Sequence, residues 1–159
     1  MTRGPARLVV EPAHLADADR VAPLFDAYRQ FYGAASDIPA ARVFLAGRLS
    51  RCESVVLLAS LEIDGEGGGI AAGFTQLYPT FSSVALGRSM VLNDLFVVPA
   101  CRRLGVARRL VAEAVEYARR AGAVRIELAT QHTNRNALWL YESEGFVRDT
   151  EFVHLGRAL

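Results

Sequence analysis

The chain has 159 residues, of which 52% are hydrophobic and 22% charged, and its formal net charge is +1. This length and composition predict one folded domain with a sizeable core and exclude a disordered chain. The near-neutral charge argues against a general binder of polyanions, and no apolar run approaches the about 18 residues that a membrane-spanning helix needs.

The first predicted elements are a strand and two helices. Apolar residues alternate with polar ones over residues 6–12, which is typical of a strand. Large apolar side chains then recur at three- and four-residue spacing over 14–33, which predicts a helix. A second helix is expected over 36–50, with Ser36 or Asp37 as its cap and Pro39 in its first turn.

The middle of the chain predicts an antiparallel meander. Strands are expected at 54–63, 70–81 and 88–99, with Pro99 ending the third of them. The glycine-rich stretch DGEGGG at 64–69 predicts the hairpin turn between the first two.

The last third of the chain alternates between helices and strands. A long amphipathic helix is expected at 105–122, then a strand at 123–130, a short helix at 134–145 and a last strand at 146–156. The whole order therefore predicts a single α/β domain over 1–159. Its mixed, mostly antiparallel twisted sheet is flanked by helices.

Two composition details exclude further classes of protein. All 18 basic residues are arginine, so a phosphate-binding loop that ends in Gly-Lys and a lysine Schiff base are both impossible. Cys52 and Cys101 have neither metal-ligand spacing nor the density of a disulfide framework, and the first residues lack the apolar segment of a signal peptide. The expected compartment is the cytoplasm.

The segment CRRLGVARRL, residues 101–110, places four arginines around Gly105 where a strand gives way to a helix. The first turn of a helix has unpaired N–H groups and the positive end of the helix dipole. A glycine there lets the backbone approach an anion closely, and the small Ala107 does not block it. The segment therefore predicts a pyrophosphate cradle, although a solvated basic helix end is the plainer alternative.

Two motifs in register resemble the GCN5-related N-acetyltransferase (GNAT) superfamily. The stretch LNDLFVVPACRRLGVARRLV resembles its acetyl-CoA signature, Arg/Gln-x-x-Gly-x-Gly/Ala, with Arg102, Gly105 and Ala107 in the three places. About 30 residues later, NRNALWLYESEGF is similar to the family's N-x-x-A-x-x-L-Y-x-x-x-G-F block, which begins at Asn134 and includes Tyr141. Weaker similarities point to its diamine/polyamine or histone-acetyltransferase-like branch.

The resemblance implies the acyl-CoA N-acyltransferase fold and an enzyme that moves an acetyl group from acetyl-CoA to a primary amine by direct attack in a ternary complex. Tyr141 would stand near the cofactor sulfur and protonate it as it leaves. The residues that would bind the cofactor's pantetheine arm and pyrophosphate are Leu95, Phe96, Val97, Arg102, Arg103, Leu104, Gly105, Val106, Ala107, Arg108 and Asn134.

The sequence identifies the residues that bind the acceptor amine less clearly than those that bind the cofactor. Asn93, Tyr32 and Tyr78 are the candidate substrate-binding residues. In the polyamine branch a glutamate stands where this chain has Asn93, and an amide cannot accept a proton. Strand alternation is expected to point the adjacent Asp94 to the other face, which leaves Glu127 or a water relay as the base.

The expected partner is a small-molecule amine or a protein amine, and a homodimer is an expectation from family analogy alone. No nucleic acid, membrane or metal partner is expected, since the three histidines lack metal-ligand spacing. A catalytically inactive acyl-CoA-binding regulatory domain is the alternative function, and tight cofactor binding without turnover would distinguish it.

Overall fold

The computed structural model describes residues 6–62 and 69–159. They fall into two compact units, one that ends at Ala129 and one that comprises Thr130–Leu159. In neither unit does a described helix have the length and apolar character needed to cross a membrane.

The first unit is built on one five-stranded sheet with the order β1-β2-β3-β4-β5. Its strands are β1 (Arg7–Pro12), β2 (Val55–Glu62), β3 (Ile70–Ser82), β4 (Gly87–Val97) and β5 (Arg125–Leu128). Neighbours pair antiparallel from β1 to β4, and β5 then pairs parallel to β4. The predicted mixed, mostly antiparallel sheet is confirmed. The turn predicted at 64–69 lies outside the described residues except for Gly69.

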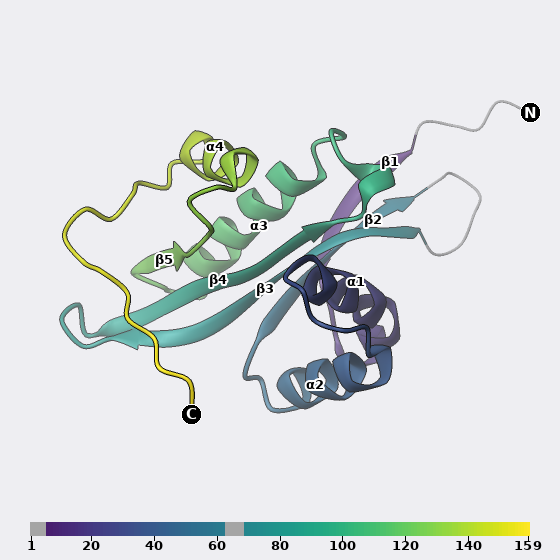
Figure 1. Ribbon diagram of the computed structural model, residues 1–159, viewed down its shortest axis with the longest axis horizontal. Helices are drawn as coiled ribbons and strands as arrows, with labels where there is room; N and C mark the ends of the chain where they lie inside the picture. Colours follow the sequence, from purple (N-terminus) through teal and green to yellow (C-terminus); the bar gives the residue numbers. More distant parts are fainter. Residues whose placement is uncertain (1–5, 63–68) are drawn as a thin grey trace, which may run out of the picture. The chain divides into compact units, whose positions relative to one another are not determined.

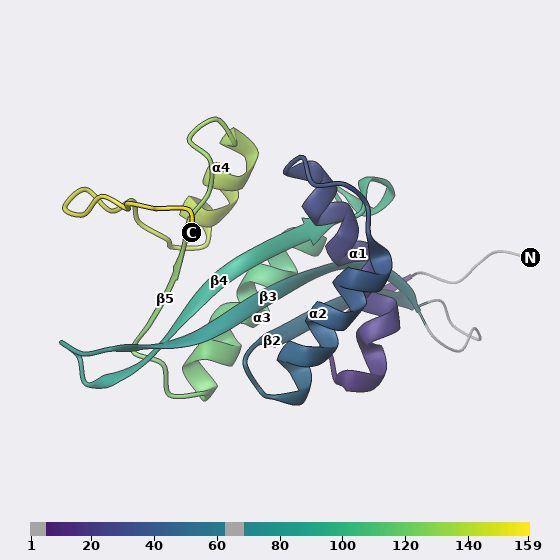
Figure 2. The same cartoon turned by 60° about the horizontal axis from the view of Figure 1, so that its bottom comes forward.

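Helices cover both faces of this sheet (Figures 1 and 2). On one face lie α1 (Ala18–Phe31), preceded by the short 3-10 helix η1 (Leu15–Asp17), and α2 (Ile38–Ser50); on the other lies α3 (Val106–Arg120). The core under α1 and α2 includes Val21, Leu45, Val56 and Phe74, all with no exposed surface. This α1/α2 face of the sheet carries part of the candidate site.

Local sequence signals explain where α2 and α3 begin. The Asp37 carboxylate accepts a hydrogen bond of 2.9 Å from the Ala40 N–H and caps α2, with Pro39 in the first turn, as predicted. Gly105 precedes α3 with a positive φ of +79°, a conformation that favours glycine. The four-spaced pairs Arg109–Glu113 (2.7 Å) and Glu116–Arg120 (3.1 Å) lie on the solvent side of α3.

The second unit contains α4 (Arg135–Ser143) and an irregular tail. The strand predicted at 146–156 is wrong, because no strand forms there. The Asp149 carboxylate accepts hydrogen bonds of 2.9 Å from the N–H groups of both Glu151 and Phe152, which turns the chain locally. Alternating apolar residues predicted the strand, but Val147 and Val153 are exposed, so no buried face selects it.

Candidate active site

The strand β4 leaves its parallel neighbour half-way along. Pairing between β4 and β5 runs from Ser89 opposite Arg125 to Leu92 opposite Leu128 and goes no further. From Asp94 to Val97, β4 still pairs with β3 on its other side, but no strand among the described residues pairs with its outer edge. The main-chain groups of Leu95, Phe96 and Val97 therefore lie along an edge that is open to an extended ligand.

The open edge leads into the loop that starts α3. Val97 is followed by the short 3-10 helix η2 (Pro99–Cys101), and the loop then takes Arg103 and Gly105 through positive φ values of +63° and +79°. The first helical hydrogen bond runs from the Arg109 N–H to the Gly105 carbonyl at 3.0 Å, so the N–H groups of the first turn have no carbonyl within the helix. A Cβ added at Gly105 would meet nothing within 4 Å. The loop therefore has the open space and the donors that an anion needs.

The side chains of the loop behave differently from its main chain. The Arg102 guanidinium donates a hydrogen bond of 3.1 Å to the Val97 carbonyl and lies 5.9 Å from the centre of the Phe96 ring. It therefore braces the loop against the end of β4. Val106 is buried, whereas Arg103, Leu104 and Arg108 are exposed and Ala107 is partly buried. A ligand would meet mostly backbone here.

A β-bulge at Asn93 marks the point where the edge opens. The pairing of β3 with β4 steps from Gln76 opposite Asp94 to Leu77 opposite Leu92, which leaves Asn93 as the extra residue. The bulge brings the two neighbouring side chains together, and the Asn93 amide donates to the Asp94 carboxylate at 3.0 Å. The expectation that Asp94 points away from Asn93 is therefore wrong, since alternation fails at a bulge.

Asp94 is 3% exposed and lies at the centre of a polar cluster. The Gln76 amide donates to Asp94 Oδ2 at 2.7 Å and also to the Tyr78 hydroxyl at 3.1 Å. From α1, the Tyr28 hydroxyl hydrogen-bonds the Asp94 carboxyl and lies 3.3 Å from the Asn93 carbonyl oxygen, to which it can donate. We call Tyr28, Gln76, Tyr78, Asn93 and Asp94 the bulge cluster.

The bulge cluster keeps a proton-binding group in the core. Burial raises the pKa of the Asp94 carboxyl above its usual range, and the hydrogen bonds from Gln76, Tyr28 and Asn93 offset this in part. Burial and the nearby Asp94 carboxylate also raise the pKa of the Tyr78 hydroxyl. All three hydrogen-bonding partners of the Asp94 carboxylate are neutral. Such a carboxyl takes up a proton at a higher pH than an ordinary aspartate does, which makes it a candidate proton acceptor.

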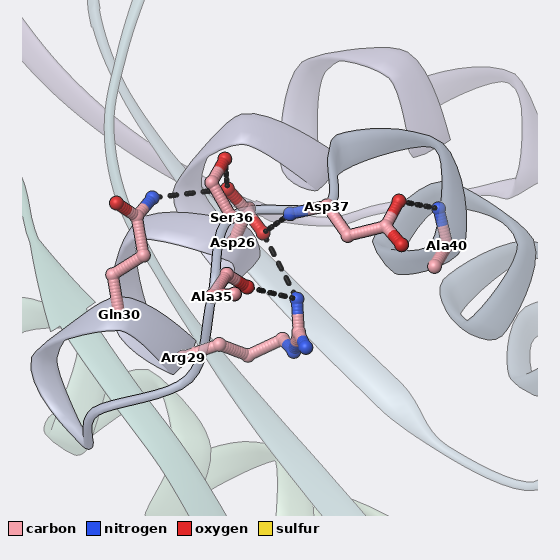
Figure 3. A network of polar contacts seen from close by, with 7 residues as sticks. All are labelled: Asp26, Arg29, Gln30, Ala35, Ser36, Asp37 and Ala40. Atoms are coloured by element: carbon pink, nitrogen blue, oxygen red, sulfur yellow. Dashed lines mark hydrogen bonds and ion pairs between the residues drawn. The ribbon is translucent and has the colours of Figure 1, made fainter.

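A second buried aspartate in the same unit has the opposite character (Figure 3). Asp26 accepts hydrogen bonds from the Ser36 hydroxyl (2.7 Å), the Asp37 N–H (2.8 Å), the Gln30 amide (3.0 Å) and the Arg29 guanidinium (3.0 Å). The hydrogen bonds from Ser36 and Asp37 lower its pKa, and the Arg29 charge adds to this. Asp26 therefore stays ionised and ties the end of α1 to the start of α2.

The structure places the three residues predicted to bind the acceptor in the bulge cluster or at its border. Tyr78 and Asn93 belong to the bulge cluster, whereas Tyr32 caps the C-terminal end of α1, is 47% exposed and contacts the Tyr28 ring at 5.1 Å between ring centres. From the sequence, Tyr28 is a candidate for the wall of the acceptor pocket together with Tyr32, Tyr78 and Phe81, whereas Gln76 has no predicted role. Aligning the two predicted strands as an antiparallel pair could have placed a glutamine opposite the Asn-Asp pair, which is the sequence signal for this cluster.

Asn134 and Tyr141 belong to the second unit. Asn134 caps α4, where its side-chain oxygen accepts a hydrogen bond of 3.2 Å from the Ala137 N–H. Tyr141 is 8% exposed and its ring lies 5.8 Å from that of Phe146. Local capping and packing therefore explain part of why this motif has these residue types.

Two further groups have structural partners or surroundings of their own. Glu127, expected as an alternative base, pairs with Arg125 at 2.7 Å on β5. Cys101 is a free, buried thiol at the end of η2. Within the described ranges, no group of three or more His, Cys, Asp or Glu side chains is arranged to hold a metal ion.

Comparison with known proteins agrees with this geometry. Residues 21–146 match the Acetyltransferase (GNAT) family. An uncharacterized N-acetyltransferase of Bacillus subtilis, YhfO, is 49% identical over 91% of this chain and 93% of its own length. The crystal structure of a probable acetyltransferase superposes with a TM-score of 0.85 at 41% identity, covering 96% of this chain and 97% of the other. The thialysine N-epsilon-acetyltransferase of Caenorhabditis elegans is 36% identical over 50% of this chain and 49% of its own. The chain belongs to the GNAT family of acetyltransferases.

Proposed function

We propose that this protein transfers an acetyl group from acetyl-CoA to a primary amine by direct attack within a ternary complex. One observation carries the proposal: the open edge of β4 begins at the bulge cluster and ends at the Gly105 loop. The main chain of this edge would hold an extended cofactor arm, and the Gly105 loop would hold its pyrophosphate. The names of the relatives support the reaction class.

The cofactor-binding part of the proposal assigns roles to the main chain. The open space at Gly105 and the N–H groups of the first α3 turn fit a pyrophosphate, and Arg102 keeps the loop in place through Val97. The main-chain groups of Leu95, Phe96 and Val97 would hydrogen-bond the pantetheine arm, and an N–H at Phe96 or Val97 would polarise the reacting carbonyl. Acetyl-CoA, when bound, supplies the activated acetyl thioester.

The proton-transfer part assigns one side chain to each proton. Asp94 takes up the proton that the acceptor nitrogen loses, because its buried carboxyl holds a proton more strongly than an ordinary aspartate. Asn93, which is exposed, donates a hydrogen bond to this carboxyl. Tyr141 holds the proton for the leaving sulfur. The family match over residues 21–146 includes both Asp94 and Tyr141, which supports giving both residues a part in the reaction.

The acceptor that we propose is a small-molecule primary amine. The relative named thialysine N-epsilon-acetyltransferase supports this class of acceptor. The aromatic rings of Tyr28 and Tyr78 near Asp94 support it too, because aromatic rings attract an alkylammonium group. The free cysteines Cys52 and Cys101 fit the cytoplasm as the compartment. A homodimer remains a prediction that sedimentation equilibrium can test.

Thiol release from acetyl-CoA, followed across a panel of diamines, amino acids and aminoglycosides, tests this function. We expect turnover with at least one primary amine and none with the corresponding alcohols. Tight acetyl-CoA binding with no turnover on any amine or on peptide N-termini would contradict the proposal and favour a regulatory acyl-CoA-binding domain.

A further inference from the structure

The Gln76 side chain, which has no exposed surface, has a fixed amide orientation. Its Nε2 donates to two acceptors, Asp94 Oδ2 at 2.7 Å and the Tyr78 hydroxyl at 3.1 Å. Rotating the amide by half a turn would place its oxygen against the Asp94 carboxylate, which is repulsive. Both amide hydrogens are therefore committed, and the amide oxygen must find its donor elsewhere.

Two buried side-chain oxygens have no hydrogen-bond partner among the described residues. They are Gln76 Oε1 and Ser54 Oγ. Val56 pairs directly with Gln76 and belongs to the core under α1 and α2. Ser54 stands two residues before Val56 and directly before the first residue of β2, so continued alternation would place it on the same face as Val56 and diagonal to Gln76. A buried water commonly bridges polar atoms in such a position.

We propose that Gln76 is the positioning residue for Asp94, and that a buried water between Gln76 Oε1 and Ser54 Oγ fixes its amide in the orientation that donates to the carboxylate. The inference rests on the proposed role of Asp94 as proton acceptor and names the residue that regulates it. Gln76 stabilises the ionised carboxylate with a charge-assisted hydrogen bond. It thereby sets the pH at which Asp94 becomes available as a base.

Gln76 is the group best placed to do this. Among the hydrogen bonds that oppose the raised pKa of Asp94, the one from Gln76 is the largest, followed by those from Tyr28 on α1 and Asn93 on β4. Arg48 on α2 faces Tyr78, whose pKa its charge lowers. The groups around Asp94 are thus two phenols and two amides.

The test is a titration of Asp94 in three forms of the full chain, followed by the 13C shift of its carboxyl carbon. Gln76→Met keeps the side chain's length and removes its donors. Its titration midpoint should rise by about one to two pH units, since a hydrogen bond to a charged group is lost. Ser54→Ala should raise it by less. Thr75→Val is the matched control, because Thr75 is equally buried but its hydroxyl donates to the Asp94 main-chain carbonyl at 2.7 Å.

The same shift should appear in the acidic limb of the kcat/KM profile of Gln76→Met, while the KM for acetyl-CoA stays unchanged. A midpoint that does not move in Gln76→Met, or that moves as far in Thr75→Val, would overturn the proposal. If Gln76→Met does not fold, the side-chain amide resonances of Gln76 in the wild type should follow the Asp94 titration. Resonances that ignore it would overturn the proposal equally. The carboxyl and amide titrations do not depend on acetyl transfer, so they can fail separately from the proposed function, whereas the kcat/KM profile tests both together.

Discussion

The loop before α3 and the bulge of β4 lie on successive segments of the chain, yet they present different kinds of groups. The loop is exposed and presents its main chain, because Gly105 at a φ of +79° opens space in front of the first helical turn. The bulge cluster is buried and presents side chains, with Asp94 held by Gln76, Tyr28 and Asn93. The exposed main chain of the loop suits an anionic group such as a pyrophosphate. The buried side chains of the bulge cluster suit a proton-binding carboxyl, because its neighbours can shift its pKa.

This difference determines which substitutions each region tolerates. A site that binds its ligand through main-chain N–H groups loses binding when a new side chain blocks them. Substitution of Gly105 should therefore weaken binding more than substitution of any of the four arginines around it. A side-chain site loses function when a single polar atom is removed, because buried donors and acceptors cannot turn to water instead.

The largest effect is expected for Gly105→Glu, which should abolish acetyl-CoA binding. The new side chain places bulk and negative charge where the pyrophosphate must meet the backbone. Gly122→Glu is the matched control, since Gly122 follows α3 with a φ of +72° and equally open space. Isothermal titration should show loss of binding in the first variant alone. Equal affinity in a folded Gly105→Glu protein would remove the cradle from this account.

Tyr141→Phe tests the proposed source of the proton for the leaving sulfur, which lies outside both the loop and the bulge cluster. It removes one hydroxyl and little volume, so folding should barely change. The kcat should fall by roughly 10²–10⁴-fold, the usual range for a lost general acid, while the KM for acetyl-CoA moves little. Steady-state kinetics on the true acceptor measures both. Retention of more than about a third of the wild-type kcat, with chemistry rate-limiting, would return Tyr141 to a packing role.

Asp94→Asn should lower kcat by roughly 10²-fold, near the lower end expected for a lost general base. Because burial raises the pKa of Asp94, wild-type kcat/KM should decline with falling pH already above the usual aspartate range. The variant should lack this limb, and a pH–rate profile of both proteins measures it. An unchanged profile would mean that Asp94 does not take up the proton.

Asp26→Asn is the control for Asp94→Asn, since it changes the other buried aspartate, which lies on α1. The pKa of Asp26 is lowered by its hydrogen bonds to Ser36 and Asp37, so its contribution to stability is present above the unfolded pKa. That contribution is lost as pH falls through the lower folded value. The Tm of Asp26→Asn should therefore drop by several degrees at neutral pH and approach the wild type in acid, while kcat is retained. Loss of kcat with an unchanged Tm would blur the distinction between the two aspartates.

Arg102→Ala should have the smallest effect. Its guanidinium holds Val97 and lies over the Phe96 ring, a contact worth about 0.5–1 kcal/mol at an exposed site. The Kd for acetyl-CoA should therefore rise only about two- to fivefold. A loss as large as that of Gly105→Glu, measured by the same titration, would show that the loop binds through side chains.

The loop was predictable from the sequence because its signal is local. A glycine between a strand and an amphipathic helix defines both the turn and the exposed N–H groups, and Gly105 and Arg102 stand in one short motif. The same holds for most helices and strands, whose periodicity is read within about 15 residues. Asp37 as the cap of α2 belongs to this class too.

The bulge cluster was not predictable in the same way because it is assembled by register. A slip of one residue at Asn93 reverses the face of every later side chain in β4, and nothing local marks it. Gln76 and Tyr28 come from elements far along the chain, so their meeting with Asp94 depends on tertiary packing. The tail shows the opposite case. The local pattern at 146–156 predicts a strand, but the chain turns at Asp149, whose carboxylate accepts hydrogen bonds from the two N–H groups that follow.

The central claim is that the acetyl group passes directly from the cofactor to an amine. Isotopically labelled acetyl-CoA, incubated with the protein and an accepted amine and analysed by mass spectrometry, tests it most directly. We predict label on the amine in an amount equal to the thiol released, and no label on the protein when the amine is left out. Labelled protein, for instance at the buried Cys101 thiol, or thiol release without labelled amine would contradict the claim.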